Sequence, residues 1–135
     1  MNYVDTNVIL SFVEKDSNHD KARKILEFDN LITGEITLIE LSSFFSRKIK
    51  DRVRAKASML YAIQATKVRV IEIDNNELIR KSTDLSTRLQ LKTLDVLQIT
   101  SAYLLKAENF LTFDKDIIGK KDLIAHEVGI EIITD

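Results

Sequence analysis

Short apolar runs alternate along this chain with longer segments of helical periodicity, and that alternation restricts the fold more than any other feature. The five runs lie at 2–5, 31–33, 68–73, 110–113 and 129–133, and the third alternates with period two, as a half-buried strand does. Strands separated by helices favour a parallel sheet, and right-handed crossovers place the helices on both of its faces. We therefore predict an α/β fold, an α/β/α sandwich around a five-stranded, mostly parallel sheet.

The segments between these runs predict helices. Helical spacing of apolar residues indicates helices at 6–13, 36–49, 52–66 and 94–106, and a weaker helical segment separates the last two strands. In the 52–66 helix the spacing rests on Val53, Ala57, Leu60 and Tyr61.

Three polar patterns predict helix starts. Ser17 to Asp20, and Asp74 with Glu77, have the form of capping boxes that begin two further helices. Thr93 is the expected N-cap of the 94–106 helix.

Composition limits both the number of domains and the kinds of metal site. The 135 residues are 44% hydrophobic, with no proline and three glycines, so we expect one domain spanning residues 1–135 with a real core. The absence of cysteine excludes a disulfide framework and a thiolate metal site, and His19 and His126 leave little for a histidine site. We assign neither histidine a catalytic role. A bound metal would be a hard cation with oxygen ligands, such as Mg²⁺ or Mn²⁺.

Charge and hydropathy bear on partners and location. The net charge of −1 does not by itself indicate a nucleic-acid binder. No apolar stretch approaches the roughly 18 residues of a transmembrane helix. Asp5 interrupts the region where a signal peptide needs its apolar core. We expect a soluble, cytoplasmic protein without a membrane partner.

Four acidic residues stand at places where a core pattern does not call for them. Asp5 ends the first strand and Asp114 follows the fourth, and ligands of parallel sheets gather at the carboxyl ends of strands. Glu40 interrupts the apolar stripe of the 36–49 helix, where an unpaired carboxylate is costly. Asp95 lies in the first turn of its helix, on its inward side.

Each of these acids also has a structural explanation. Asp5 or Asp114 can serve as a helix N-cap, Asp95 can interact with the helix dipole, and Glu40 can pair with a neighbouring cation, Arg47 or Lys48. If the four carboxylates converge, they suit hard divalent cations, and two such ions about 3.5–4 Å apart can hold a phosphodiester and activate water. Asn7 and Thr112 can then orient ligands from a second layer, or make ordinary turn and strand-edge hydrogen bonds.

Four segments together resemble the PIN-domain family, and within it the VapC-type toxins of toxin–antitoxin pairs. They are VDTNVIL, ITLIELSSFF, LKTLDVLQITSA and FLTFDKDI, in the family's order over nearly the whole chain. The resemblance implies a PIN-like fold and a metal-dependent endoribonuclease that binds one or two Mg²⁺ or Mn²⁺ ions and leaves 5′-phosphate and 3′-hydroxyl ends. It also implies a small antitoxin partner that covers the site, and a homodimer.

The resemblance also carries residue roles onto this chain. The family's catalytic, metal-binding acids fall on Asp5, Glu40, Asp95 and Asp114. Supporting positions fall on Asn7 and Thr112, and Asp116 adds a further carboxylate.

Six of the ten residues in the stretch 47–56 are basic. Arg47, Lys48, Lys50 and Arg52 are therefore candidates to hold RNA phosphates near the mouth of the cleft. A solvated helix surface or an antitoxin contact explains the same stretch. The neighbouring Phe44, Phe45, Met59 and Tyr61 form either a groove for a partner helix or part of the core.

Other functions compete with the nuclease. DTNV approximates the motif of haloacid-dehalogenase phosphatases, but Asn7 stands where that family needs a carboxylate. A receiver-like signalling domain would have adjacent acids after its first strand, and this chain does not. A PIN-fold RNA-binding or scaffold module without catalysis, and a housekeeping RNA-processing nuclease, remain alternatives.

Overall fold

A parallel sheet of five short strands forms the centre of the molecule. The computed structural model describes residues 1–135. The sheet has the order β3-β2-β1-β4-β5, and every neighbouring pair is parallel. The strands are β1 (Asn2–Val4), β2 (Leu31–Gly34), β3 (Arg69–Ile71), β4 (Asn109–Leu111) and β5 (Glu131–Ile133).

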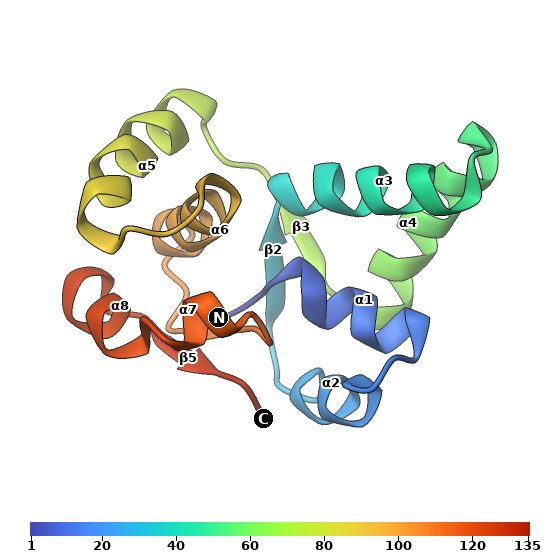
Figure 1. The fold of residues 1–135 in the computed structure, drawn as a ribbon, viewed down its shortest axis with the longest axis horizontal. Helices are drawn as coiled ribbons and strands as arrows, with labels where there is room; N and C mark the ends of the chain where they lie inside the picture. The colour runs from blue at the N-terminus through green and yellow to red at the C-terminus, as the bar shows by residue number, and fades with distance from the viewer.

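Helices cover both faces of the sheet (Figure 1). One layer contains α1 (Thr6–Glu14), α2 (His19–Ile25), α3 (Ile36–Ile49) and α4 (Arg52–Thr66). The other contains α5 (Asn75–Leu89), α6 (Thr93–Leu104), α7 (Lys115–Ile118) and α8 (Lys121–Val128). The predicted α/β/α sandwich is confirmed, and its sheet is parallel throughout. No helix combines the length and the apolar character needed to cross a membrane.

Alternation along the strands divides the core into two clusters. Tyr3 and Phe110 face α5, α6 and α8, and their rings stack with centroids 5.3 Å apart. The next residues along the chain, Val4 and Leu111, face the layer of α1 to α4. Because successive side chains of a strand point to opposite faces, β1 and β4 each bury one aromatic and one aliphatic residue with only three residues.

The predicted element bounds differ from the observed ones mainly at the ends. Helices α3 and α4 have the predicted limits, whereas β3 is shorter than the predicted 68–73 run and α6 ends at Leu104. The N-cap of α6 is Lys92 and not Thr93, and its side chain makes no capping hydrogen bond. Thr93 is instead the first helical residue.

The two capping-box predictions had different outcomes. The predicted cap at 17–20 is wrong, because α2 begins after Asn18 without a side-chain cap. Asp16 stabilises that turn instead, by accepting a hydrogen bond from the Asn18 amide at 2.9 Å. The helix start at Asp74 is confirmed, since its carboxylate accepts from the amide of Glu77 at 3.1 Å, although the Glu77 side chain makes no return hydrogen bond.

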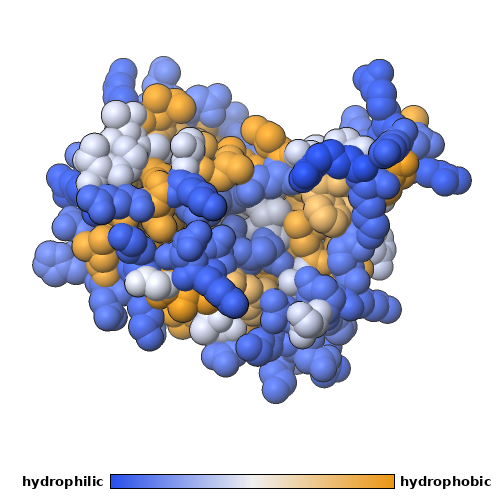
Figure 2. Space-filling view, viewed as in Figure 1, coloured by the Kyte–Doolittle hydropathy of each residue, from blue (hydrophilic) through white to orange (hydrophobic).

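Helix α4 buries a different side from the one that its apolar spacing indicated. Val53, Leu60 and Tyr61 are 79%, 55% and 64% exposed. The buried residues are Ala55, Ala62 and Thr66. Small side chains let α4 pack closely against α1 and α3, so the larger apolar residues lie outside. From the corner where α3 meets α4, long hydrophilic side chains extend into solvent (Figure 2).

The order of the strands determines where ligands can approach. The chain builds outward from β1 to β2 and β3, and then returns to place β4 on the opposite side of β1. The crossovers on the two sides of β1 therefore diverge, which leaves a crevice at the carboxyl ends of β1 and β4.

Candidate active site

A cleft of about 250 Å³ opens at the carboxyl ends of β1 and β4. All four predicted acids line it: Asp5, Glu40, Asp95 and Asp114. They come from four separate parts of the chain, the ends of β1 and β4 and the helices α3 and α6. The remaining lining side chains are Thr6, Asn7, Leu10, Phe44 and Arg47.

Asp5 caps α1 and also faces the cleft. It is 6% exposed, and its Oδ1 accepts the amide of Thr6 at 2.8 Å. Its Oδ2 accepts the Thr112 hydroxyl at 2.7 Å and the Asn7 amide at 3.1 Å. A carboxylate has about four acceptor positions, so the protein uses three and leaves one for a ligand in the cleft.

Thr112 and Asn7 connect the two strand ends. The Thr112 hydroxyl donates to Asp5 and accepts the backbone amide of Asp114 at 3.0 Å. The Asn7 side chain donates to Asp5, and its carbonyl oxygen accepts the amide of Phe113 at 3.0 Å. These contacts fix the distance between α1 and the segment after β4, which is the geometry expected of supporting residues.

Asp114 and Asp95 lie close to a third carboxylate. Oxygen atoms of Asp95, Asp114 and Asp116 lie within 4.8 Å of one another. Asp114 caps α7, because its Oδ1 accepts the amides of Asp116 at 2.8 Å and Ile117 at 3.1 Å. Its Oδ2 has no protein partner, so Asp114, like Asp5, combines a capping role with a position in the cleft.

Glu40 is held by a buried hydrogen-bond network that sequence reasoning did not identify. Its Oε1 accepts the Thr6 hydroxyl at 2.8 Å and the Gln98 Nε2 at 2.5 Å. Gln98, 1% exposed, also donates to Thr37 at 3.1 Å and accepts the Tyr3 hydroxyl at 2.5 Å. The alternative explanation of Glu40, an ion pair with Arg47 or Lys48, is wrong: Lys48 pairs with Glu14, and Glu40 forms no ion pair within the chain. The available signal was a glutamine one helical turn after Asp95, inside an apolar segment.

The surroundings raise the pKa values of two of these acids. Burial is the largest cause for Asp5, whose pKa rises to about 7, with the charges of Glu40 and Asp95 adding to it and the hydrogen bond from Thr112 opposing it. Burial also raises the pKa of Asp95 to about 6, assisted by the charges of Asp114, Asp116 and Glu40. The neighbouring carboxylates therefore add to the effect of burial and make ionisation of Asp5 and Asp95 less favourable.

The donor set fits a hard divalent cation. Among Asp5, Glu40, Asp95, Asp114 and Asp116, only Asp116 forms an ion pair, with Lys92 at 4.0 Å on the exposed rim. Asp5, Asp95 and Asp114 thus offer carboxylate oxygens to the cleft without a cationic partner from the chain. Mg²⁺ and Mn²⁺ prefer such oxygen ligands, and a cation would favour the ionised carboxylates that burial and mutual repulsion disfavour.

The four predicted RNA-binding residues occupy different positions. Arg47 lines the cleft, and its Nε donates to the carbonyl of Ser43 at 3.1 Å, one turn back toward the acids. Lys48 pairs with Glu14. Lys50 and Arg52 are exposed at the α3–α4 corner and line none of the larger cavities.

Of the two explanations for the four apolar residues of α3 and α4, a partner groove or part of the core, the core holds for two of them. Phe45 is buried in the core at 5% exposure, and Met59 packs against the same core cluster. Phe44 is half-buried and lines the acidic cleft, whereas Tyr61 is exposed on α4. These residues therefore belong to three different surroundings.

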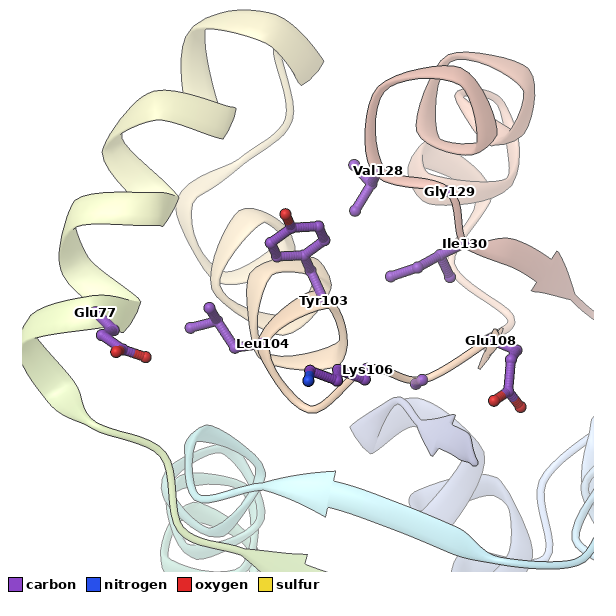
Figure 3. Close-up of a pocket in the computed structure, with 9 residues that line it drawn as sticks. Glu77, Tyr103, Leu104, Lys106, Glu108, Val128, Gly129 and Ile130 are labelled. Carbon is purple, nitrogen blue, oxygen red and sulfur yellow. The ribbon is translucent and has the colours of Figure 1, made fainter.

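A larger hollow of about 490 Å³ lies beside the amino ends of β4 and β5, away from the acids (Figure 3). Its two carboxylates, Glu77 and Glu108, lie on opposite sides of Tyr103. Apolar side chains, among them Val128 and Ile130, line the space between them. No set of oxygen ligands converges in this hollow. A metal site can therefore form only in the acidic cleft, at the carboxyl ends of the strands.

Comparison with known protein families matches the PIN domain over residues 3–122 of this chain. A search of curated proteins finds no match.

Solved structures of toxin–antitoxin proteins have similar folds. VapBC2 from Rickettsia felis, bound to a DNA fragment from its promoter, aligns with a TM-score of 0.69 and 20% identity over 98% of each chain. VapC20 from Mycobacterium tuberculosis, a Sarcin-Ricin loop cleaving toxin, aligns with a TM-score of 0.69 and 18% identity over 88% of this chain and 94% of that one. VapBC-1 from nontypeable Haemophilus influenzae aligns with a TM-score of 0.71 and 17% identity over 98% of this chain and 97% of that one.

Proposed function

This chain belongs to the PIN-domain family, as its sequence motifs predicted, and from that premise we propose that it is a metal-dependent endoribonuclease, the toxin of a toxin–antitoxin pair. The observation that carries the proposal is the convergence of Asp5, Glu40, Asp95 and Asp114 on one cleft. Three of them, Asp5, Asp95 and Asp114, have no cationic partner inside the cleft. A purely structural role for these acids does not explain such a concentration of unpaired charge.

In this proposal the acids hold one or two Mg²⁺ or Mn²⁺ ions. Asp5, Glu40, Asp95 and Asp114 are the proposed ligands, and Asp116 is positioned to add a further carboxylate. The bound cation would supply Lewis-acid stabilisation of the phosphodiester and activation of the attacking water. No side-chain nucleophile is needed, and hydrolysis would leave 5′-phosphate and 3′-hydroxyl ends.

The other cleft residues have supporting roles in the proposal. Thr112 and Asn7 hold the Asp5 carboxylate in one orientation, and Gln98 holds Glu40 in the same way. The guanidinium of Arg47 offers charged donors to a phosphate at the mouth of the cleft, where paired N–H groups match phosphate oxygens. Lys50 and Arg52 extend this basic surface beyond the cleft.

The proposed partners are a small antitoxin and a second copy of the chain. Two of the structurally similar proteins are toxin–antitoxin complexes. On this chain, Val53, Leu60 and Tyr61 form an exposed apolar stripe on α4, beside the basic corner. Apolar side chains gathered on one helix face indicate a protein contact.

The test is cleavage of a labelled mixture of cellular RNAs by the purified protein, with Mg²⁺ or Mn²⁺ and with EDTA. We expect discrete cuts that require the metal and disappear in the Asp5→Asn variant, which preserves shape and removes a proposed ligand. Asp122→Asn, on the exposed surface of α8, is the matched control and should cleave normally. Cleavage that persists in Asp5→Asn contradicts the proposed metal site. Metal binding without any cleavage would instead identify a scaffold that has lost catalysis.

A further inference from the structure

A second cavity continues from the acidic cleft. It measures about 490 Å³, within the range of small-molecule sites. It shares Asn7, Leu10 and Phe44 with the cleft, so the two spaces meet along one wall. A ligand with two linked parts can therefore occupy both spaces at once.

Phe44 stands between the two cavities. Its ring is half-buried and packs edge-on against Phe45, with centroids 5.2 Å apart and an interplanar angle of 83°. Because Phe45 is itself buried in the core, this contact restricts the orientation of the Phe44 ring. Leu10 adds an aliphatic surface on the opposite helix, α1. The ammonium group of Lys48 lies 5.9 Å from the centre of the Phe44 ring. The boundary between the cavities thus combines an aromatic ring and an aliphatic side chain with the polar side chain of Asn7.

The rest of the second cavity is polar, with a charge pattern unsuited to a phosphate. Glu14 and Lys48 pair across it, and this pair leaves little net charge. Asp16 adds a further carboxylate, which is held by the Ser11 hydroxyl at 3.0 Å. An anion would be repelled here, whereas a neutral ring with N–H donors and a carbonyl acceptor would meet complementary groups.

We propose that this second cavity binds the RNA base adjacent to the phosphodiester held by the acids, with the base stacked on Phe44. The inference rests on the proposed ribonuclease function and specifies how the substrate is read. Single-stranded RNA is recognised by stacking of bases on aromatic side chains and by hydrogen bonds to their edges. Arg47, on the cleft side, then contacts the phosphate. The Glu14–Lys48 pair, in the second cavity, contacts the base.

The polar groups favour guanine among the four bases. Its edge carries two adjacent N–H donors, which suit the carboxylate of Glu14 or Asp16, beside a carbonyl oxygen, which suits the ammonium group of Lys48. The other bases offer a single donor group on the corresponding edge. We therefore expect cleavage next to guanosine in single-stranded RNA.

Fluorescence tests the stacking without depending on catalysis. The chain has no tryptophan, so a Phe44→Trp variant carries one reporter at the boundary of the two cavities. Mixing with a uridine oligomer containing one guanosine, with Mg²⁺ present and the signal read by stopped flow before cleavage occurs, should quench this fluorescence. An oligomer with an abasic position in place of the guanosine should quench it less. Phe28→Trp, at a partly exposed aromatic position outside both cavities, is the matched control and should not respond.

Cleavage kinetics test the same contact in variants that carry no tryptophan. Phe44→Leu keeps an apolar side chain but removes the ring, and we expect KM to rise by about 5- to 150-fold, the range for loss of one stacked base. Phe44→Tyr should restore KM. The double variant Glu14→Gln, Lys48→Met should cleave with less preference for guanosine. Thermal unfolding of each variant checks that the fold is retained.

The outcomes separate this inference from the function on which it rests. Metal-dependent cleavage together with an unquenched Phe44→Trp variant and an unchanged KM in Phe44→Leu would overturn the base site and leave the nuclease intact. Quenching without cleavage would retain the base site and reject the nuclease. Neither quenching nor cleavage would reject both.

Discussion

Single residues in this protein serve the fold and the cleft together. Asp5 and Asp114 are N-caps of α1 and α7, which is the ordinary role of an aspartate after a strand, and both also line the acidic cleft. The two explanations were alternatives for the sequence, but they are compatible in three dimensions. A capping carboxylate uses only part of its acceptor capacity, so the remaining lone pairs can face a ligand.

Gln98 provides the sharpest prediction at the scale of one residue. In Gln98→Met, Glu40 loses its Nε2 donor and the Tyr3 hydroxyl loses its acceptor. We expect metal affinity or cleavage to fall by about 10- to 100-fold, as for other residues that orient ligands. The free energy of unfolding should fall by about 1–3 kcal/mol, because buried polar groups are left unsatisfied.

Calorimetric titration with Mn²⁺ and urea unfolding measure the two effects of this change. Gln64→Met, on the exposed side of α4, is the control and should alter neither quantity. Gln98→Met with normal Mn²⁺ affinity and normal cleavage would show that the glutamine stabilises the core without positioning Glu40.

At the scale of elements, packing and not periodicity selects the buried side of a helix. The apolar spacing of α4 runs through its exposed residues, whereas Ala55 and Ala62 make the close contacts with the neighbouring helices. In α3, likewise, the apolar stripe expected beside Glu40, through Ile36 and Phe44, is only half-buried. The residues that α3 buries lie one position further along the chain, at Thr37, Leu41 and Phe45. Helix α4 covers a layer that other helices already fill, and only small side chains fit there.

Two substitutions on α4 test this. The loss of a large apolar side chain should change the free energy of unfolding less than an enlarged alanine does, although hydrophobicity alone predicts the reverse. Leu60→Ala removes a large side chain that is 55% exposed and should change the free energy of unfolding by about 0.5 kcal/mol or less. Ala62→Leu inserts atoms at a fully buried position and should cost about 1–3 kcal/mol. Urea unfolding of both variants measures the difference. If Leu60→Ala lowered the free energy of unfolding more than Ala62→Leu does, the side of α4 that contains Leu60 would be the buried one, contrary to this structure.

At the scale of the whole molecule, the order of the strands concentrates negative charge at the carboxyl ends of β1 and β4. The acids come from β1, α3, α6 and the segment after β4, and they meet only because β1 lies between β2 and β4. The folded state therefore holds carboxylates closer together than the unfolded chain does. Stability of the whole protein should then depend on pH and on divalent cations.

The sign of the pH dependence follows from the raised pKa values. Asp5 titrates near 7 and Asp95 near 6 in the folded protein, against 3.8 for each unperturbed group, so the folded state binds more protons between these limits. Their contribution to stability is present below about pH 4 and is lost as the pH rises toward 7. In EDTA, the Tm should fall over this range, and less so in Asp5→Asn.

Divalent cations should reverse this loss. Mg²⁺ or Mn²⁺ binds the ionised carboxylates of the folded state, so either ion should raise the Tm more at pH 8 than at pH 5. Circular dichroism at both pH values, with EDTA and with each metal, measures the effect. Equal Tm shifts at the two pH values, or a shift that survives in Asp5→Asn, would exclude binding at these acids.

The sequence by itself determined the elements and the types of residue between them. Strand alternation, helical spacing and caps such as Asp74 depend on neighbours within a few positions, so they can be recognised from local patterns. The motif around Asp5 and the other acids also indicated the family, because those residues keep their order along the chain.

Only the tertiary structure decided which of these residues meet. Thr112 reaches Asp5 across 107 positions of sequence, and Gln98 reaches Glu40 across 58. The exposed side of α4 and the cavity beyond Phe44 likewise depend on how helices stack on the sheet. Such contacts follow from the order of the strands and from the volumes of distant side chains, which no local pattern contains.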